Sequence, residues 1–327
     1  MASPLDFINQ ADGIYEIHNA KEHPQLWQAM DNPGHPLNVA WPLFLDQDAT
    51  FTRYYPKLVE YEQLARHQYA ITETDSAGNV SIVACARSVP FYWPGDCLVD
   101  GTGEINHEAL QKLPQGGYDT ILARGVRQYL SRHNLPGASI ALTEDQERDF
   151  WVCQSHNPPN ALSAISITVR PDRRRRGLAE ALIQTMKQTA IQQQLHLLVV
   201  PLRPTRKADF PTVLMDEYVR WPNPKGCGPF DPWLRKHVQL GAQIIKVAPT
   251  SMVVSGSVAE WTKWTKMDIE QLLQRMCPQD VSLESRTNKL YVEVSFPGGL
   301  VPLRYYFKEG RCLYTEPNVW LFHDLQV

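Results

Sequence analysis

The stretch Ile165–Gln192, ISITVRPDRRRRGLAEALIQTMKQTAIQ, decides the fold of this 327-residue chain. Apolar residues at 165, 167 and 169 alternate with hydroxyl residues at 166 and 168, the period-two pattern of a strand with one apolar face. Pro171 ends that strand, because proline cannot donate a hydrogen bond to a sheet. Beyond Gly177 the apolar period becomes helical. The predicted apolar face of this helix consists of Leu178, Leu182, Ile183, Met186 and Ala190.

The turn between strand and helix carries four arginines, Arg173–Arg176, followed by Gly177. The start of a helix leaves backbone N–H groups unpaired, and the helix dipole adds partial positive charge there. Gly177 lets the backbone approach an anion without an intervening Cβ atom, and Ala179 leaves the second approach nearly as open. Arginine side chains add bidentate contacts to the same oxygens. The turn therefore predicts a phosphate-binding loop.

Two other interpretations of the arginine run stay open at this point. Clustered charges are often a solvated turn, and clustered cations also neutralise nucleic-acid phosphates. The run stands alone, however, in a slightly acidic chain of net charge -3 and pI near 6.4. Nucleic acid is therefore not expected to be the main partner.

Composition describes a globular protein with ample core, with 43% hydrophobic and 20% charged residues. No apolar run is long enough to cross a membrane, and the N-terminus lacks the basic and apolar regions of a secretory signal. The six cysteines form no C-x-x-C pair, so structural zinc, or any other metal, is not expected. We interpret them as reduced thiols in a cytoplasmic protein.

The pattern Val169-x-Pro171-x-x-Arg174-x-x-Gly177-x-Ala179 resembles the acyl-CoA-binding motif of the GNAT acyltransferase superfamily. The resemblance implies that backbone N–H groups from Arg175 to Ala179 hold the CoA pyrophosphate and that the end of the preceding strand binds the pantetheine arm. The predicted cofactor-binding residues are accordingly Ile167, Thr168, Val169, Arg174, Arg175, Arg176, Gly177, Leu178 and Ala179. The co-substrate would be acetyl-CoA or another acyl-CoA.

The rest of the chain fits a mixed α/β sheet. Residues 69–89 predict a hairpin with its turn at Gly78-Asn79, residues 118–134 a helix and residues 139–143 a strand. The apolar run His196–Pro201 predicts a buried parallel strand, which completes a right-handed βαβ unit. By the resemblance, the two parallel strands splay apart and the acyl-pantetheine inserts between them.

We expect a GNAT-like acyltransferase domain over residues 1–255, with a CoA-binding core at 163–255 and an N-terminal elaboration. Residues 243–247 and 251–255 predict two closing strands. Residues 256–327 predict a C-terminal α+β extension packed on the domain, with strands at 290–296, 303–307 and 312–316. A homodimer is possible.

Candidate catalytic residues come from the second half of the chain. His237, in a predicted helix at 233–240, stands where the resemblance places a tyrosine that protonates the leaving thiolate; its ordinary pKa of about 6.5 permits an acid or a base role. An exposed, non-catalytic helix histidine is the alternative. The CoA-binding strand lacks the glutamate base found in many relatives, so Asp216 and Glu217, in the long loop 203–231, are candidate bases. The alternatives are a chain of water molecules and an amine that arrives already neutral. A long loop of this kind is often functional, and we expect it to shape the acceptor site; a plain surface elaboration is the alternative.

Trp41, Phe44 and Phe51 are either cleft-lining or core residues.

The prediction for the whole chain is an acyl-CoA-dependent N-acyltransferase that moves an acetyl or longer group directly to an amine of a small molecule or peptide. A backbone N–H near Thr168 or Val169 would stabilise the oxyanion. The alternatives are a non-catalytic acyl-CoA sensor and an O-acyltransferase acting on a hydroxyl, with a nucleic-acid-binding protein placed last.

Overall fold

The computed structural model describes residues 3–8, 13–93, 98–99, 104–137 and 157–325. The predicted strand at 139–143, Cys97 and Cys153 lie outside these ranges. Among the described helices, none combines the length and apolar character needed to cross a membrane. The described side chains also contain no group of three His, Cys, Asp or Glu residues suited to a metal ion.

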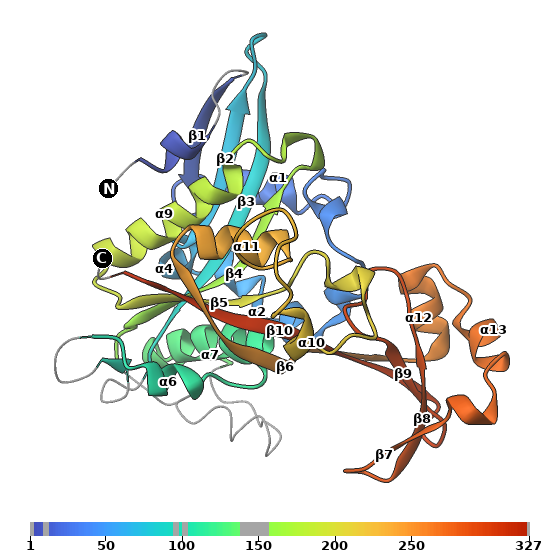
Figure 1. Ribbon diagram of the computed structural model, residues 1–327. Coiled ribbons are helices and arrows are strands. Elements are labelled where there is room, and N and C mark those ends of the chain that lie inside the picture. Colours follow the sequence, from blue (N-terminus) through green and yellow to red (C-terminus); the bar gives the residue numbers. More distant parts are fainter. Residues whose placement is uncertain (1–2, 9–12, 94–97, 100–103, 138–156, 326–327) are drawn as a thin grey trace.

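A single mixed sheet organises the molecule (Figure 1). All strand pairs in it are antiparallel except β4 with β5, which are parallel, as the sequence predicts. The strands, in sheet order, are β1 (Ile14–Asn19), β2 (Gln68–Thr74), β3 (Val80–Phe91), β4 (Ala161–Val169), β5 (Leu197–Leu202), β10 (Arg311–Asp324), β9 (Leu303–Tyr306), β8 (Lys289–Val294) and β7 (Ser282–Glu284), while β6 (Ala242–Gly256) pairs with β10.

Two long helices cover opposite faces of the sheet. Helix α9 (Leu178–Gln192) buries the predicted apolar face against one side of β4 and β5, and α7 (Gly117–Arg132) packs against the other side. The alternation of β4 and β5 residues between the two cores follows from the period of a strand. The predicted strand–turn–helix, the hairpin β2–β3 and the helix α7 are confirmed.

Shorter helices frame the sheet ends. The N-terminal part contains η1 (Pro4–Phe7), α1 (Pro24–Met30), α2 (Ala49–Tyr54), α3 (Lys57–Glu60) and α4 (Glu62–Ala65). The later part contains α6 (His107–Gln111), α10 (Met215–Tyr218), α11 (Pro232–Gln239), α12 (Val258–Thr265) and α13 (Ile269–Gln274). Figure 1 shows α12, α13 and β7–β9 grouped at one end of the molecule, away from α9.

The sheet is continuous across residue 255. Strand β10 lies between β5 and β6, pairing with β5 over residues 319–324 and with β6 over most of its length. The segment after residue 255, expected to pack on the domain as an extension, thus supplies one of its central strands. Two separate closing strands were predicted where β6 is a single strand of 15 residues. The two predicted strands are therefore one strand, but its pairing with β10 has a register shift between Ala248 and Met252, in the predicted gap.

The long loop 203–231 is held by two buried charges. The Lys207 ammonium is fully buried and donates hydrogen bonds to the carbonyls of Phe210 and Leu300, at 2.8 and 2.6 Å. The Asp231 carboxylate, also buried, accepts from the backbone N–H groups of Trp233 and Leu234 and so caps α11. Because the loop ends on this cap, its fold sets the position of α11.

Candidate active site

The turn before α9 has the backbone geometry of an anion site. Arg175 and Gly177 both adopt left-handed conformations, with φ of 66° and 85°. Such a turn directs successive backbone N–H groups toward one side and forms a concave anion-binding nest. No described residue accepts a hydrogen bond from the backbone N–H of Arg174, Arg175, Gly177, Leu178 or Ala179. These donors are therefore open to a phosphate at the start of the helix.

The four arginines divide into two pairs. Arg173 donates to Glu73 at 2.6 Å, and Arg176 lies 3.5 Å from the same carboxylate and 3.3 Å from the Tyr15 hydroxyl. Glu73 is buried; burial alone would raise its pKa, but the hydrogen bonds from Arg173 and Tyr15 lower it on balance. Arg174 and Arg175 are left to face the groove described next.

A groove of about 830 Å³ runs along the turn. Eight of the nine predicted cofactor-binding residues line it, namely Ile167, Thr168, Val169, Arg174, Arg175, Gly177, Leu178 and Ala179. Arg176 contacts Glu73 and Tyr15 and does not line the groove, although Arg173, which pairs with the same carboxylate, does. The Thr168 hydroxyl accepts a hydrogen bond from the Trp41 indole at 2.8 Å, and Thr168 pairs with Cys85 of β3.

The reason why position 177 requires glycine differs from the one inferred from the sequence. A Cβ atom at this position would lie 1.6 Å from the carbonyl oxygen of Phe7. The close approach that requires glycine is therefore that of the N-terminal segment, in addition to the left-handed φ. Toward the groove, the backbone offers the N–H groups that have no hydrogen-bond partner.

Strands β4 and β5 separate beside the groove. They pair only from Ala161–Leu197 to Ser163–Val199, although β4 continues to Val169. Beyond Ser163, the edge of β4 that faces β5 has no partner strand in the described part of the chain. This gap is the splay that the family resemblance implies, and it leaves backbone groups free to bind an extended ligand.

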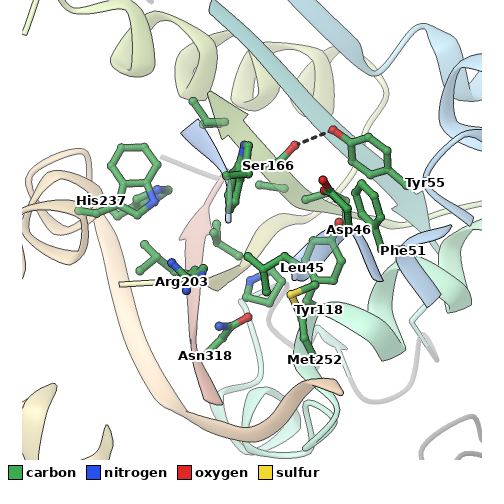
Figure 2. A pocket seen from close by; sticks show the side chains of 18 of the residues that line it. Leu45, Asp46, Phe51, Tyr55, Tyr118, Ser166, Arg203, His237, Met252 and Asn318 are labelled. Carbon is green, nitrogen blue, oxygen red and sulfur yellow. Dashed lines mark hydrogen bonds between the residues drawn. The ribbon is translucent and has the colours of Figure 1, made fainter. Parts of the chain in front are cut away.

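A second cavity, of about 210 Å³, opens in the gap between the strands (Figure 2). It shares Trp41, Ile167, Arg203 and Trp233 with the groove, so the two spaces meet. Its walls come from β4, β5, α11 and the N-terminal loops. Trp41 and Phe51 line it, whereas Phe44 is a core residue, 1% exposed.

His237 lies against this cavity and is buried, with 1% of its surface exposed. Its Nδ1 atom is 3.0 Å from Nε2 of His323 on β10, and the Trp233 ring covers one edge of it. Burial, together with the neighbouring His323, lowers the pKa of His237 well below its ordinary value. The imidazole is therefore neutral at pH 7, which suits a base better than an acid. The alternative of an exposed helix histidine is wrong.

The loop carboxylates lie elsewhere. Asp216 and Glu217, both on α10, are exposed and line neither the groove nor the cavity. Among the residues that the structure describes, the acidic side chain that lines the cavity is Asp46, on the short turn before α2. Figure 2 shows Asp46 beside Phe51 and Tyr55, across the cavity from His237. The Asp46 side chain is also exposed to solvent. Partial desolvation by the surrounding protein raises the pKa of its carboxyl, and no described residue forms an ion pair with it.

Arg203 stands where groove and cavity meet. Its guanidinium donates to Glu316 at 2.9 Å and to the Gly298 carbonyl at 2.6 Å. Glu316 is completely buried and also accepts from Tyr314 at 2.6 Å. This satisfied ion pair fixes Arg203 at the mouth of the cavity, so that part of the long loop does contribute to the site.

Comparison with known proteins identifies the family. The chain is 32% identical over 317 residues to the arginine N-acetyltransferase avaD of Aspergillus versicolor, covering 95% of this chain and 94% of that protein. The chain belongs to the GNAT acyl-CoA N-acyltransferases. This GNAT enzyme therefore moves an acyl group from an acyl-CoA to an amine, and the predictions of its fold, class and co-substrate type are confirmed.

The chain is also similar to solved structures, at lower sequence identity. The loading GNAT-like domain of CurA from Lyngbya majuscula is 15% identical, with a TM-score of 0.49 and coverage of 96% of this GNAT chain and 98% of that one. A polyamine N-acetyltransferase of Drosophila melanogaster is 16% identical, with a TM-score of 0.32 and coverage of 72% and 87%. No protein-family model matches the chain.

Sequence reasoning missed three residues of this GNAT site. Trp233 lines both spaces, Asp46 lines the cavity and His323 contacts His237. Trp233 could have been found four residues before His237 on the predicted helix, since residues i and i+4 share a helix face. Asp46 and His323 lie far from the motif in sequence and carry no local signal.

Proposed function

We propose that this enzyme transfers the acetyl group of acetyl-CoA to a small acceptor that carries a guanidinium or similar cation, such as arginine. One observation carries the proposal: the cavity next to the CoA groove offers an unpaired carboxylate, Asp46, beside two aromatic rings. The relative avaD is named for arginine. Aromatic faces and a carboxylate are the groups that hold a guanidinium in proteins.

The acetyl-CoA would lie in the groove. Its pyrophosphate would accept hydrogen bonds from the backbone N–H groups between Arg174 and Ala179, with Arg174 and Arg175 adding positive charge. The pantetheine arm would pair with the open edge of β4 beyond Ser163, which brings the thioester to the gap between β4 and β5. A backbone N–H of that edge, near Thr168 or Val169, would bind the oxyanion.

The acceptor would fill the cavity with its cation at Asp46 and its reacting nitrogen at the opposite, His237 end. The nitrogen attacks the thioester carbon directly, the C–S bond breaks, and the thiolate takes up a proton. Neutral His237, which lines the cavity, would accept the proton that the nitrogen loses. Direct transfer needs no covalent enzyme intermediate, since both substrates would reach the junction at Trp41 and Arg203, which line both spaces.

The test is a comparison of two carboxylate variants. Purified enzyme is assayed for CoA thiol release from acetyl-CoA with arginine, lysine and leucine as acceptors. Asp46→Asn is expected to raise KM for arginine about tenfold, by removing one charge-assisted contact, and to leave KM for acetyl-CoA unchanged. Asp216→Asn, at an exposed position outside the cavity, is the matched control and is expected to leave both KM values unchanged.

Equal effects of the two variants, or leucine turning over as well as arginine, would contradict the cation site. Loss of activity in Asp216→Asn or Glu217→Gln, with Asp46→Asn unaffected, would restore the loop carboxylates as the catalytic candidates.

A further inference from the structure

Asp48 and Asp119 place two carboxyl groups against one backbone N–H. Asp48 caps α2, and Asp119 lies in the first turn of α7. The N atom of Val253, on β6, is 3.3 Å from Oδ2 of Asp48 and 3.2 Å from Oδ2 of Asp119. One hydrogen atom can bond two acceptors only if both lie in the same narrow cone around the N–H direction. The two carboxyl oxygens are therefore neighbours.

No cation compensates for two negative charges at this place. Asp48 is 1% exposed, and Oδ1 of Asp119 is buried. In the part of the chain that the structure describes, no lysine, arginine or histidine forms an ion pair with either residue. Two ionised carboxylates in contact repel each other, so such a pair keeps one proton, and the acid donates a hydrogen bond to the carboxylate.

The hydrogen-bond donors around the pair assign this proton to Asp119. Asp48 accepts from the Phe51 N–H at 2.7 Å as well as from Val253, and such donors stabilise the ionised form. Oδ1 of Asp119 has no hydrogen-bond partner among the described residues. A missing partner costs less for the carbonyl oxygen of a neutral acid than for a carboxylate oxygen. Asp119 is therefore the acid and Asp48 the carboxylate.

The surroundings favour the same assignment. Burial, together with the charge of Asp48, raises the pKa of Asp119 well above its ordinary range, although the start of α7 favours negative charge. Ionisable groups on the surrounding elements include Glu316 of β10, which is paired with Arg203, Arg87 of β3, Tyr55 and Tyr118.

The pair joins three elements that form the acceptor cavity. Phe51 on α2, Tyr118 on α7 and Met252 on β6 all line it, as Figure 2 shows. Asp119 directly follows Tyr118, the shared N–H directly follows Met252, and Asp48 caps the helix that carries Phe51. Neither carboxyl group lines the cavity, so its effect on a substrate must pass through these neighbouring side chains.

We propose that Asp119 is a positioning residue for the acceptor, because its carboxylic acid donates to Asp48 and holds the cavity walls of α2, α7 and β6 together. The inference rests on the proposed function, in which this cavity binds the acceptor. As the pH rises, Asp119 loses its proton to solvent, the two carboxylates repel each other, and the walls separate. Other residues line the groove, so acceptor binding weakens while acetyl-CoA binding does not.

Two variants at position 119 separate this hydrogen bond from packing. Asp119→Asn keeps a neutral donor of similar size, which can bond Asp48 at any pH, whereas Asp119→Leu removes the donor. At neutral pH we expect KM for arginine to rise about tenfold in Asp119→Leu, by loss of one charge-assisted hydrogen bond, and to stay within about twofold of the wild type in Asp119→Asn. KM for acetyl-CoA should not change in either. Equal KM values for arginine in the two variants overturn the inference.

The proton itself is observed by NMR of the full chain with ¹³C-labelled aspartate carboxyl groups, assigned with Asp119→Asn and Asp48→Asn. We expect Asp119 to be protonated and Asp48 ionised at pH 7. The wild-type KM for arginine, divided by that of Asp119→Asn at each pH, should rise across the pH at which Asp119 loses its proton. This ratio cancels the titration of the acceptor amine.

An Asp119 that is ionised at pH 7 overturns the inference, even if Asp119→Leu does not fold. A KM ratio that stays constant across the titration of Asp119 also overturns it. The proposed function fails in a different way. If the wild type releases no CoA thiol with any amine, the proposed acceptor chemistry is wrong, whatever the protonation of the pair. If the wild type turns over arginine but Asp119 is ionised, only the positioning role is lost.

Discussion

Gly177 offers the sharpest test of how the CoA loop is built. Substitution by alanine places a Cβ atom 1.6 Å from the Phe7 carbonyl oxygen and 2.6 Å from the Phe7 carbonyl carbon. Both are backbone atoms, so the clash cannot be relieved by rotating a side chain. The N-terminal segment must move away from the start of α9. Gly241 has nearly the same left-handed backbone, with φ of 88°, and nothing within 4 Å of its Cβ position, which makes it a matched control.

The expected loss has two parts. An L-residue in the left-handed region costs about 1–2 kcal/mol of unfolding free energy at either position. At Gly177 the displaced segment also takes Ile8, which is 6% exposed, out of its buried site, at a further cost of about 2 kcal/mol. Gly177→Ala should therefore lose about 3–4 kcal/mol, and Gly241→Ala about 1–2 kcal/mol.

Thermal denaturation of the two variants and the wild type measures this difference. We expect the Tm of Gly177→Ala to fall several degrees below that of Gly241→Ala, and limited proteolysis to cut its N-terminus more readily. Weaker acetyl-CoA binding should accompany the change, because the displaced loop holds the N–H donors. Equal Tm values for the two variants would refute the close approach of Phe7 to Gly177.

The remaining predictions concern charge. Arg174→Ala should raise KM for acetyl-CoA about tenfold by removing a charge-assisted phosphate contact. Arg176→Ala should mainly lower Tm, because Arg176 contacts Glu73. A larger rise of KM in Arg176→Ala than in Arg174→Ala, measured by steady-state kinetics, would contradict the division of the arginines. Burial, reinforced by Arg66, lowers the pKa of His67 from 6.5 to about 4, so the unfolded state binds its proton first as pH falls. Between pH 6.5 and 4, His67 should therefore lower the free energy of unfolding by about 3 kcal/mol. A His67→Gln variant whose Tm falls equally steeply over this pH range would show that His67 is not the cause.

The sequence was sufficient for the parts of the fold that are encoded locally. The strand before the arginine turn, the apolar face of α9 and the parallel strand after it each have a periodicity that a single segment carries. The position of β10 does not have such a signal. Its central place follows from pairing with β5 and β6, which lie more than 50 residues earlier, and a local pattern cannot choose between a central strand and a strand of a separate unit.

The site was predictable to a similar degree. The groove residues are contiguous in sequence, so one motif located eight of them. Arg176 was not separable from Arg174, since only the fold brings Glu73 to one and not the other. The carboxylates Asp216 and Glu217 were chosen for their place in a long loop, but that loop is anchored by Lys207 and presents them to solvent.

The most direct test of the central claim is the release of CoA thiol from acetyl-CoA by the full chain, with and without arginine, and with the product identified by mass spectrometry. We expect thiol release to require the acceptor and acetyl-arginine to form in equal amount. Thiol release that does not depend on arginine, or no release with any cationic amine, would contradict it.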